Sequence, residues 1–142
     1  MIVTFFGHSN TSQSVQIKLE TVLIHLIEKK GATFFYIGNH GNFDLMVKNT
    51  LKELKCKYPH INYAVVLAYM PKGKNGIDYS QTIFPECLAS VHPKYAIAKR
   101  NRWMIEQSDV VVTYVKYSTG GAVQFKELAE KKGKTVINLA DD

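Results

Sequence analysis

The chain has 142 residues, of which 46% are hydrophobic and 21% are charged, and its formal net charge is +6. This length suits one domain with its own hydrophobic core, and the composition excludes collagen-like repeats, low-complexity sequence and intrinsic disorder. No apolar run is long enough for a membrane span, and we expect no targeting segment at the start of the chain. The basic residues are scattered, which favours a lysine-rich surface over a dedicated site for a nucleotide or a nucleic acid.

The cysteines and histidines do not form a metal motif. Cys56 and Cys87 occur in dissimilar contexts, and the histidines show neither an i, i+4 pair nor a Cys/His cluster. We therefore expect no metal and no other cofactor. The cysteine usage also predicts a reducing, cytoplasmic setting, and we expect no membrane partner.

The first half of the chain alternates short apolar runs with amphipathic stretches. Residues 2–6 form a continuous apolar run that predicts a buried strand. A helix follows, for which Thr11 and Ser12 offer N-cap hydroxyls, and which ends at Lys29-Lys30-Gly31. The next predicted elements are a strand at 33–37, a helix at 42–58 and a strand at 63–69.

The second half begins with a long segment, residues 70–93, that prolines and glycines interrupt. Connections of this length in compact domains are typical of lids or binding loops, so we predict a lid or variable loop there. A helix at 93–108, a strand at 109–115, a helix at 120–133 and a strand at 135–139 follow. This alternation predicts a single α/β domain over residues 1–142, with a three-layer, doubly wound, Rossmann-like sheet of about five mainly parallel strands and helices on both faces.

Three of the strand-to-helix turns are rich in glycine and small polar residues. Ligands of doubly wound sheets bind beyond the carboxyl ends of the strands, where glycines let the backbone approach a phosphate and helix N-termini point amide groups at it. The alternative is that such turns need glycines and capping residues for structural reasons alone. The candidate ligand-binding residues are Gly7, His8, Ser9 and Thr11 after the first strand, Gly38, Asn39, His40 and Gly41 after the second, and Ser118, Thr119, Gly120 and Gly121 after the fourth.

Two histidines in these turns leave two interpretations open. His8 and His40 each follow a strand, where an imidazole can contact a base, a ribose or a phosphate. Each ring can equally cap its own loop. The sequence does not choose between these roles.

The helix at 93–108 carries an asparagine on its buried face. Helical spacing puts Asn101 beside Ile97 and Met104, and a buried asparagine needs hydrogen-bond partners. Arg100 and Arg102 flank it. We expect Arg100 and Asn101 to reach a ligand at the sheet edge, with Arg100 extending into solvent and contributing little to stability. The alternative is an ordinary basic helix whose arginines face water.

Three separated motifs occur along the chain, namely Phe6-Gly7-His8, Lys99-Arg100-Asn101-Arg102-Trp103-Met104, and Gly120-Gly121 ahead of Phe125-Lys126-Glu127-Leu128. In this order they resemble the SLOG superfamily, which joins the DprA-type DNA-processing proteins with the Lonely Guy phosphoribohydrolases. The resemblance spans nearly the whole chain and is closest to the small standalone bacterial members.

The resemblance implies a function at the sheet edge. The Lonely Guy enzymes cleave the N-glycosidic bond of adenosine-monophosphate-type cytokinin precursors, and Arg100, Met104 and Asp109 match the spacing of their helix motif. Gly120, Gly121 and Glu127 match part of their Pro-Gly-Gly-x-Gly-Thr-x-x-Glu motif. This chain departs from that motif where Ser118-Thr119 replace the proline and Val123-Gln124 replace Gly-Thr.

Three functional hypotheses follow. The first is binding of a nucleotide or nucleotide-derived ligand by a sensor or accessory protein. The second is N-glycoside hydrolysis of a nucleoside monophosphate, in which Glu127, expected at the border of a buried face, activates water or stabilises the oxocarbenium-like sugar while Arg100 holds the phosphate or the carboxylate. The weakest is single-stranded DNA binding, for which Tyr69, Tyr79 and Tyr117 are the candidate stacking residues. The resemblance further suggests a homodimer.

Overall fold

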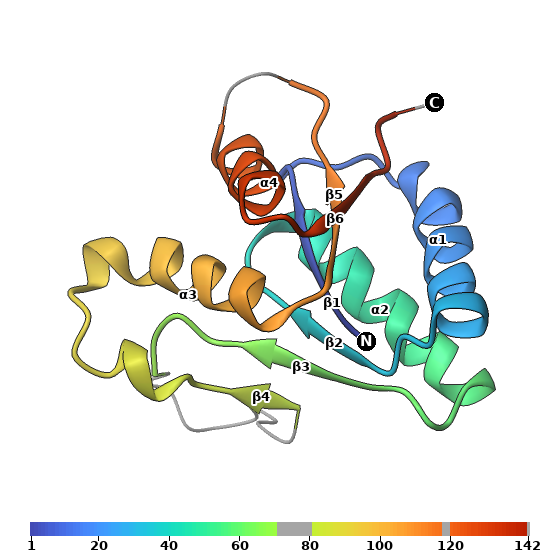
Figure 1. Ribbon diagram of the computed structural model, residues 1–142, viewed down its shortest axis with the longest axis horizontal. Helices are drawn as coiled ribbons and strands as arrows, with labels where there is room; N and C mark the ends of the chain where they lie inside the picture. Colours follow the sequence, from blue (N-terminus) through green and yellow to red (C-terminus); the bar gives the residue numbers. More distant parts are fainter. Residues whose placement is uncertain (71–80, 118–119, 142) are drawn as a thin grey trace.

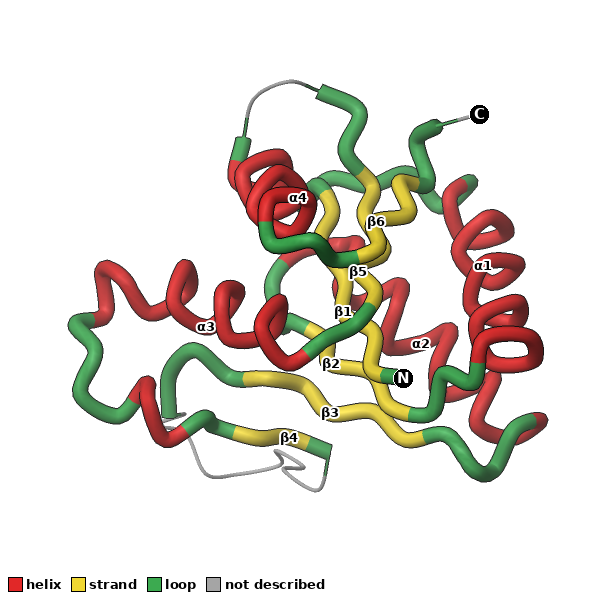
Figure 2. The backbone as a smooth tube through the Cα atoms, in the orientation of Figure 1, coloured by secondary structure: helices red, strands yellow, loops and turns green. Residues whose placement is uncertain are grey.

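The computed structural model describes residues 1–70, 81–117 and 120–141 (Figures 1 and 2). In the described residues, six parallel strands form one sheet in the order β4-β3-β2-β1-β5-β6. The strands are β1 (Ile2–Gly7), β2 (Phe34–Ile37), β3 (Asn62–Val66), β4 (Thr82–Ile83), β5 (Val110–Tyr114) and β6 (Thr135–Asn138). The predicted Rossmann-like fold is confirmed, with one strand more than the five we expected.

Four helices cover the two faces of the sheet. They are α1 (Val15–Lys30), α2 (Gly41–Lys57), α3 (Pro93–Gln107) and α4 (Gly121–Lys131), and a short 3-10 helix, η1 (Glu86–Leu88), precedes α3. One core contains Phe5 together with buried residues of α1 and α2, and the other contains Phe6 together with buried residues of α3 and α4. Phe5 and Phe6 of β1 therefore face opposite helical layers, as the alternation of a strand requires. Figure 1 shows these layers on the two sides of the sheet. Because both faces are covered, the strands are apolar on both sides.

The strand order reverses beside β1. The chain moves outward from β1 through β2 and β3 to β4, and then returns through α3 to place β5 on the other side of β1. The register pairs Phe5 with Val112 and Gly7 with Tyr114. The strands β1 and β5 are therefore direct neighbours in the sheet. The loop after β1 leads to α1 on one face of the sheet, and the loop after β5 leads to α4 on the other face. Because the two loops diverge, a crevice opens between them at the carboxyl edge.

Some local predictions are wrong. The N-cap of α1 is Ser14, and the Thr11 hydroxyl instead donates a hydrogen bond to the carbonyl of His8 at 2.6 Å. The predicted end of α1 is correct, because Gly31 has a φ of 77° and its N–H donates to the carbonyl of Leu26. Ile97 is 37% exposed, not buried as its helical spacing suggested.

The segment predicted as a lid contributes to the sheet. Residues 81–92 contain β4, which pairs with β3, and η1, whereas residues 71–80 lie outside the described residues. A two-residue strand leaves no periodic pattern in the sequence, so β4 could not be predicted. Within the described ranges, no helix is long and apolar enough to span a membrane.

Candidate ligand site at the carboxyl edge of the sheet

A cavity of about 470 Å³ lies at the carboxyl edge, where the two helical layers diverge. The ends of β1 and β2, the loop after β5, the inner face of α3 and the start of α4 all line it. The cavity therefore lies beside the switch point that the strand order predicts.

Two glycines make the floor of this cavity possible. A Cβ atom on Gly7 would lie 2.4 Å from the ring of Phe43, and a Cβ atom on Gly38 would lie 2.6 Å from Asp44 Oδ2. Both distances are shorter than real Cβ contacts, so a side chain at either position would have to displace Phe43 or Asp44 in the first turn of α2, which packs directly on the strand ends. Close packing of the protein itself accounts for both residues.

Arg100 is a buried cation in the wall of the cavity. Its exposed fraction is 2%, and its guanidinium reaches from α3 across the ends of the strands. Nε donates to Asn101 Oδ1 at 2.7 Å, and Nη1 donates to Asn39 Oδ1 at 2.9 Å and to the carbonyl of Val66 at 3.0 Å. The prediction that Arg100 extends into solvent is therefore wrong, because its hydrogen-bond partners lie inside the sheet edge. Asn101 is buried as predicted, and it has the hydrogen-bond partner that a buried asparagine needs.

Asp44 is the carboxyl group beside this cation. Burial raises the pKa of Asp44 to about 6, although the hydrogen bond from the His40 backbone N–H and the Arg100 guanidinium oppose the shift. Desolvation and then Arg100 lower the pKa of His40, and its Nδ1 lies 3.4 Å from Arg100 Nη2. A guanidinium can only donate, so this contact requires an unprotonated His40 Nδ1. Burial also lowers the pKa of Arg100, and the nearby Asp44 partly offsets that effect.

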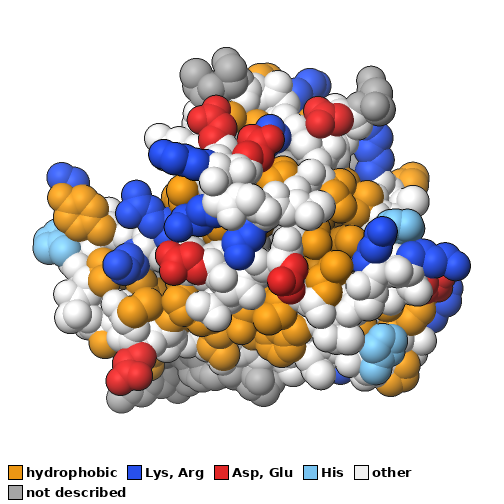
Figure 3. Space-filling view, viewed as in Figure 1, with side chains coloured by type: hydrophobic (Ala, Val, Ile, Leu, Met, Phe, Trp, Pro, Cys, Tyr) orange, Lys and Arg blue, Asp and Glu red, His pale blue; other side chains and the backbone are white. Residues whose placement is uncertain are grey.

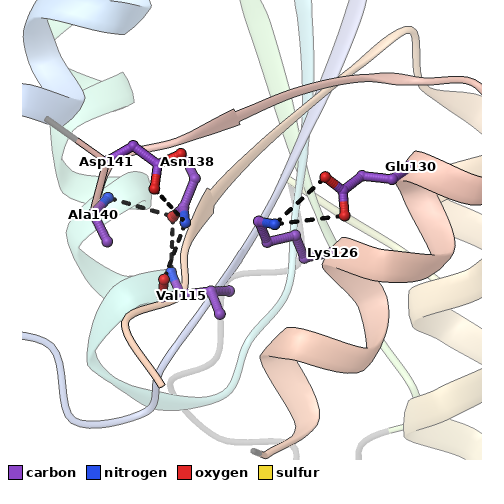
Figure 4. Close-up of polar contacts among 6 residues, drawn as sticks. All are labelled: Val115, Lys126, Glu130, Asn138, Ala140 and Asp141. Atoms are coloured by element: carbon purple, nitrogen blue, oxygen red, sulfur yellow. Dashed lines mark hydrogen bonds and ion pairs between the residues drawn. The ribbon is translucent and has the colours of Figure 1, made fainter. Parts of the chain in front are cut away.

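His8 ties together the loops that leave β1 and β5. Its Nε2 accepts a hydrogen bond from the backbone N–H of Lys116 at 2.8 Å, and its ring centroid lies 5.0 Å from that of Tyr117. The ring therefore holds the loop after β5, and not its own loop as the capping interpretation had it, and it also lines the cavity. Asn138 on β6 clamps the same loop, because its side-chain amide accepts from the N–H of Val115 and donates to its carbonyl (Figure 4).

The start of α4 presents its backbone to the cavity. Gly120, with a φ of 113°, is the N-cap, and among the described residues no side chain caps the helix. The first turn reads Gly-Ala-Val-Gln and has no charge, and a Cβ on Gly121 would have nothing within 4 Å in the described structure. One turn further on, Lys126 and Glu130 form an ion pair of 3.4 Å along the helix (Figure 4). The first amide groups of α4 are consequently available to a ligand.

The sequence matches the YspA SLOG family over residues 2–137. The chain belongs to this family. The resemblance to the SLOG superfamily, which rested on three short motifs, is thereby confirmed. A comparison with curated proteins finds no significant match.

Two solved structures share the fold of this SLOG domain. DNA processing protein A from Helicobacter pylori, in a study of its single-stranded DNA binding mode, has a TM-score of 0.68 and 18% identity, covering 96% of this chain and 63% of that one. DNA processing protein A from Streptococcus pneumoniae also has a TM-score of 0.68, with 16% identity, covering 94% of this chain and 48% of that one. The SLOG domain thus spans less than two thirds of either neighbour, and the likeness shows the fold.

Most of the site residues that we predicted from the sequence line the cavity at the carboxyl edge. That they bind a ligand stays a prediction. They come from four separate parts of the chain, which the fold brings together at the sheet edge. They are Gly7, His8, Ser9, Gly38, His40, Arg100, Asn101, Gly120 and Gly121.

Other predicted residues lie outside the lining of this cavity. Thr11 lines a separate groove between α1 and α2, Asn39 acts through its bond to Arg100, and Gly41, with a φ of 87°, packs its Cα region against Ser9. Glu127 is exposed on α4, so the expected position at the border of a buried face is wrong. Ser118 and Thr119 lie outside the described residues.

The sequence pattern did not predict that Asp44 and an apolar wall line the cavity. Asp44 follows a glycine-rich turn in the first turn of a helix, where an acidic residue is expected merely to complement the helix dipole. The wall is formed by Phe6, Met104 and Phe125, and the rings of Phe6 and Phe125 stack with centroids 5.5 Å apart. The helical spacing of Met104 indicated burial, but not that a cavity adjoins it.

A larger groove of about 690 Å³ lies between η1, α3 and α4, on the face where Lys and Arg side chains gather in Figure 3. Lys99, Arg102 and Lys132 line it together with Glu86 and Glu106. The groove contains charges of both signs. Helices form its walls, and the backbone groups inside a helix are already hydrogen-bonded to one another. The residues that follow β1 and β2 line the smaller cavity instead. Nor does the described part of the chain gather three or more His, Cys, Asp or Glu side chains that could hold a metal ion.

Proposed function

We propose that this SLOG protein binds a nucleotide or nucleotide-derived ligand in the cavity at the carboxyl edge, as a sensor or an accessory protein. One observation carries the proposal. A single cavity of about 470 Å³ combines a buried guanidinium, a helix start that no described side chain caps, and an apolar wall. These are the three kinds of surface that a phosphate, a sugar and a base require.

The start of α4 is the proposed phosphate position. The start of a helix is the positive end of its dipole, and its first amide groups can donate hydrogen bonds to a phosphate. The first turn of α4 also contains no acidic residue that would repel an anion. Gly121 leaves the backbone open to close approach. The sequence departs here from the Lonely Guy motif, but the departures do not remove these backbone donors.

The apolar wall is the proposed position of the base. Phe125 is partly exposed and offers a flat surface on which a planar ring can pack, and the buried Phe6 and Met104 belong to the same apolar cluster. Single-stranded nucleic acid is the second candidate ligand, because Tyr117 is 62% exposed and lines the same cavity. Stacking of successive bases on exposed rings is the usual way in which proteins hold single strands.

Hydrolysis of a nucleotide is not part of the proposal. Glu127, which the resemblance assigns to catalysis, is exposed and lies outside the lining of the cavity. A homodimer and a cytoplasmic location stay predictions from the sequence.

The test is isothermal titration calorimetry with the four ribonucleoside 5′-monophosphates and with a short deoxythymidine oligonucleotide. The Gly121→Val variant places a branched side chain over the α4 amides and should abolish nucleotide binding, while it leaves the fold intact because the position is open. Gln124→Val, an exposed site on the same helix outside the lining of the cavity, is the matched control and should bind normally. Nucleotide binding that survives in Gly121→Val would contradict the proposed phosphate position.

A further inference from the structure

The cavity contains a carboxyl group to which the proposed function assigns no task. Asp44 lies in the first turn of α2 and lines the cavity. The backbone N–H of His40 donates to its Oδ2 at 3.0 Å, which fixes the orientation of the carboxyl group. Burial keeps its pKa near 6, so the group is mainly ionised at neutral and higher pH.

Asp44 and Arg100 meet at one glycine. The Cβ position of Gly38 lies 2.6 Å from Asp44 Oδ2 and 3.5 Å from Arg100 Cζ. Both side chains line the cavity, so a hydrogen-bond acceptor and a cluster of donors, with opposite charges, lie close together in its wall beside Gly38. A phosphate here would be attracted by the guanidinium but repelled by the carboxylate. An uncharged O–H or N–H group suits the point better, because it donates to the carboxylate without repulsion.

This point is separate from the proposed phosphate position. Asp44 lies at the start of α2, which follows β2, whereas α4 follows β5, and β1 lies between those two strands. Two strand spacings amount to roughly 10 Å. One ligand can therefore place its phosphate at α4 and a different part of its structure at Asp44.

We propose that Asp44 is a ligand-recognition residue that accepts a hydrogen bond from an uncharged O–H or N–H donor of the nucleotide, either a sugar hydroxyl or the edge of the base. The proposal rests on the function proposed above and adds to it the chemistry of a second recognition point. It gives the site a carboxylate other than Glu127, which the sequence motif indicates but which is exposed outside the lining of the cavity.

Whether the Asp44→Asn substitution weakens or strengthens ligand binding tests this role. Asp44→Asn keeps the shape and removes the charge. If Asp44 accepts from an uncharged donor, the ribonucleoside 5′-monophosphate that binds the wild type best should bind Asp44→Asn at least tenfold more weakly, whereas Glu127→Gln should bind it normally. If Asp44 only lies near the phosphate, removal of its negative charge should strengthen binding. Unchanged or tighter binding to Asp44→Asn overturns the proposal, as does an equal loss in Glu127→Gln.

The remaining arms identify the donor and separate the two proposals. If the wild type prefers ribonucleotides to deoxyribonucleotides and Asp44→Asn does not, the donor belongs to the sugar. If instead Asp44→Asn loses a preference among the bases, the donor belongs to the base. Thermal melting verifies that the variant is folded, and Asp44→Ser is a second replacement that should show the same loss. If no nucleotide binds the wild type, the proposed function fails and this inference fails with it. If nucleotides bind and only the effect of Asp44 is missing, the proposed function stands alone.

Discussion

Replacement of Arg100 by alanine should destabilise the fold strongly, although the residue is a charged arginine on a helix. The side chain is 2% exposed and donates hydrogen bonds to two buried acceptors, Asn101 Oδ1 and the carbonyl of Val66. An orphaned buried acceptor costs about 1–3 kcal/mol, and release of a desolvated cation offsets part of this loss. We expect the free energy of unfolding to fall by about 3 kcal/mol, and the melting temperature to fall by roughly 10 °C for a domain of this size.

The assay is urea denaturation followed by circular dichroism, with differential scanning calorimetry as a second readout. Arg102→Ala is the matched control, because Arg102 lies two residues further along α3 and is exposed. Its free energy of unfolding should change by no more than about 0.5 kcal/mol. Equal and small effects of the two substitutions would contradict this prediction, since the buried hydrogen bonds of Arg100 would then contribute nothing measurable to stability.

Three more predictions follow from other parts of the site. Because burial raises the pKa of Asp44 to about 6 from 3.8, the folded state holds this proton more tightly than the unfolded chain, and wild-type stability should fall as the pH rises between these values. Denaturation at several pH values should show Asp44→Asn gaining up to roughly 3 kcal/mol over the wild type across that interval; a constant difference would contradict the shift. Gly7→Ala, which places a Cβ 2.4 Å from the Phe43 ring, should cost about 1–3 kcal/mol in urea denaturation, and a neutral effect would show that the first turn of α2 yields easily. Asn138→Ala removes both hydrogen bonds to the Val115 backbone and should speed hydrogen exchange in the loop after β5, whereas unchanged protection would mean that His8 alone holds the loop.

The sequence predicted the architecture well because the fold depends on patterns that a short window contains. Apolar strands, amphipathic helices and a glycine after the lysines of α1 are local signals, and they also place the loops after β1 and β5 at one edge. The two-residue β4 has no such signal. It exists because it pairs with β3, a contact between distant parts of the chain.

The electrostatics of the site could not be predicted in the same way. The burial of Arg100 depends on the carbonyl of Val66 and on Asn39, which belong to other elements. One local signal was available, because Arg100 lies four residues before the buried Met104 and therefore on the same face of α3. Asp44 becomes a site residue only because α2 packs its first turn beneath Gly38, and sequence spacing does not report such packing.

Glu127 illustrates the opposite failure. Its spacing from the paired glycines matches a catalytic motif, but the spacing fixes only its position and face on α4, not how α4 is rotated relative to the cavity. The structure leaves Glu127 exposed, while the carboxyl group that lines the cavity comes from α2. A motif match transfers a chemical role only when the rotation of the helix brings the side chain to the site.

The most direct test of the proposed ligand site is a crystal structure of the protein grown with the nucleoside 5′-monophosphate that it binds best. We expect electron density for the phosphate at the amide groups of Gly121 and Ala122, with the rest of the ligand extending between the apolar wall and Asp44. A nucleotide found instead in the groove lined by Lys99 and Arg102, with the cavity at the sheet edge empty, would contradict the proposed site.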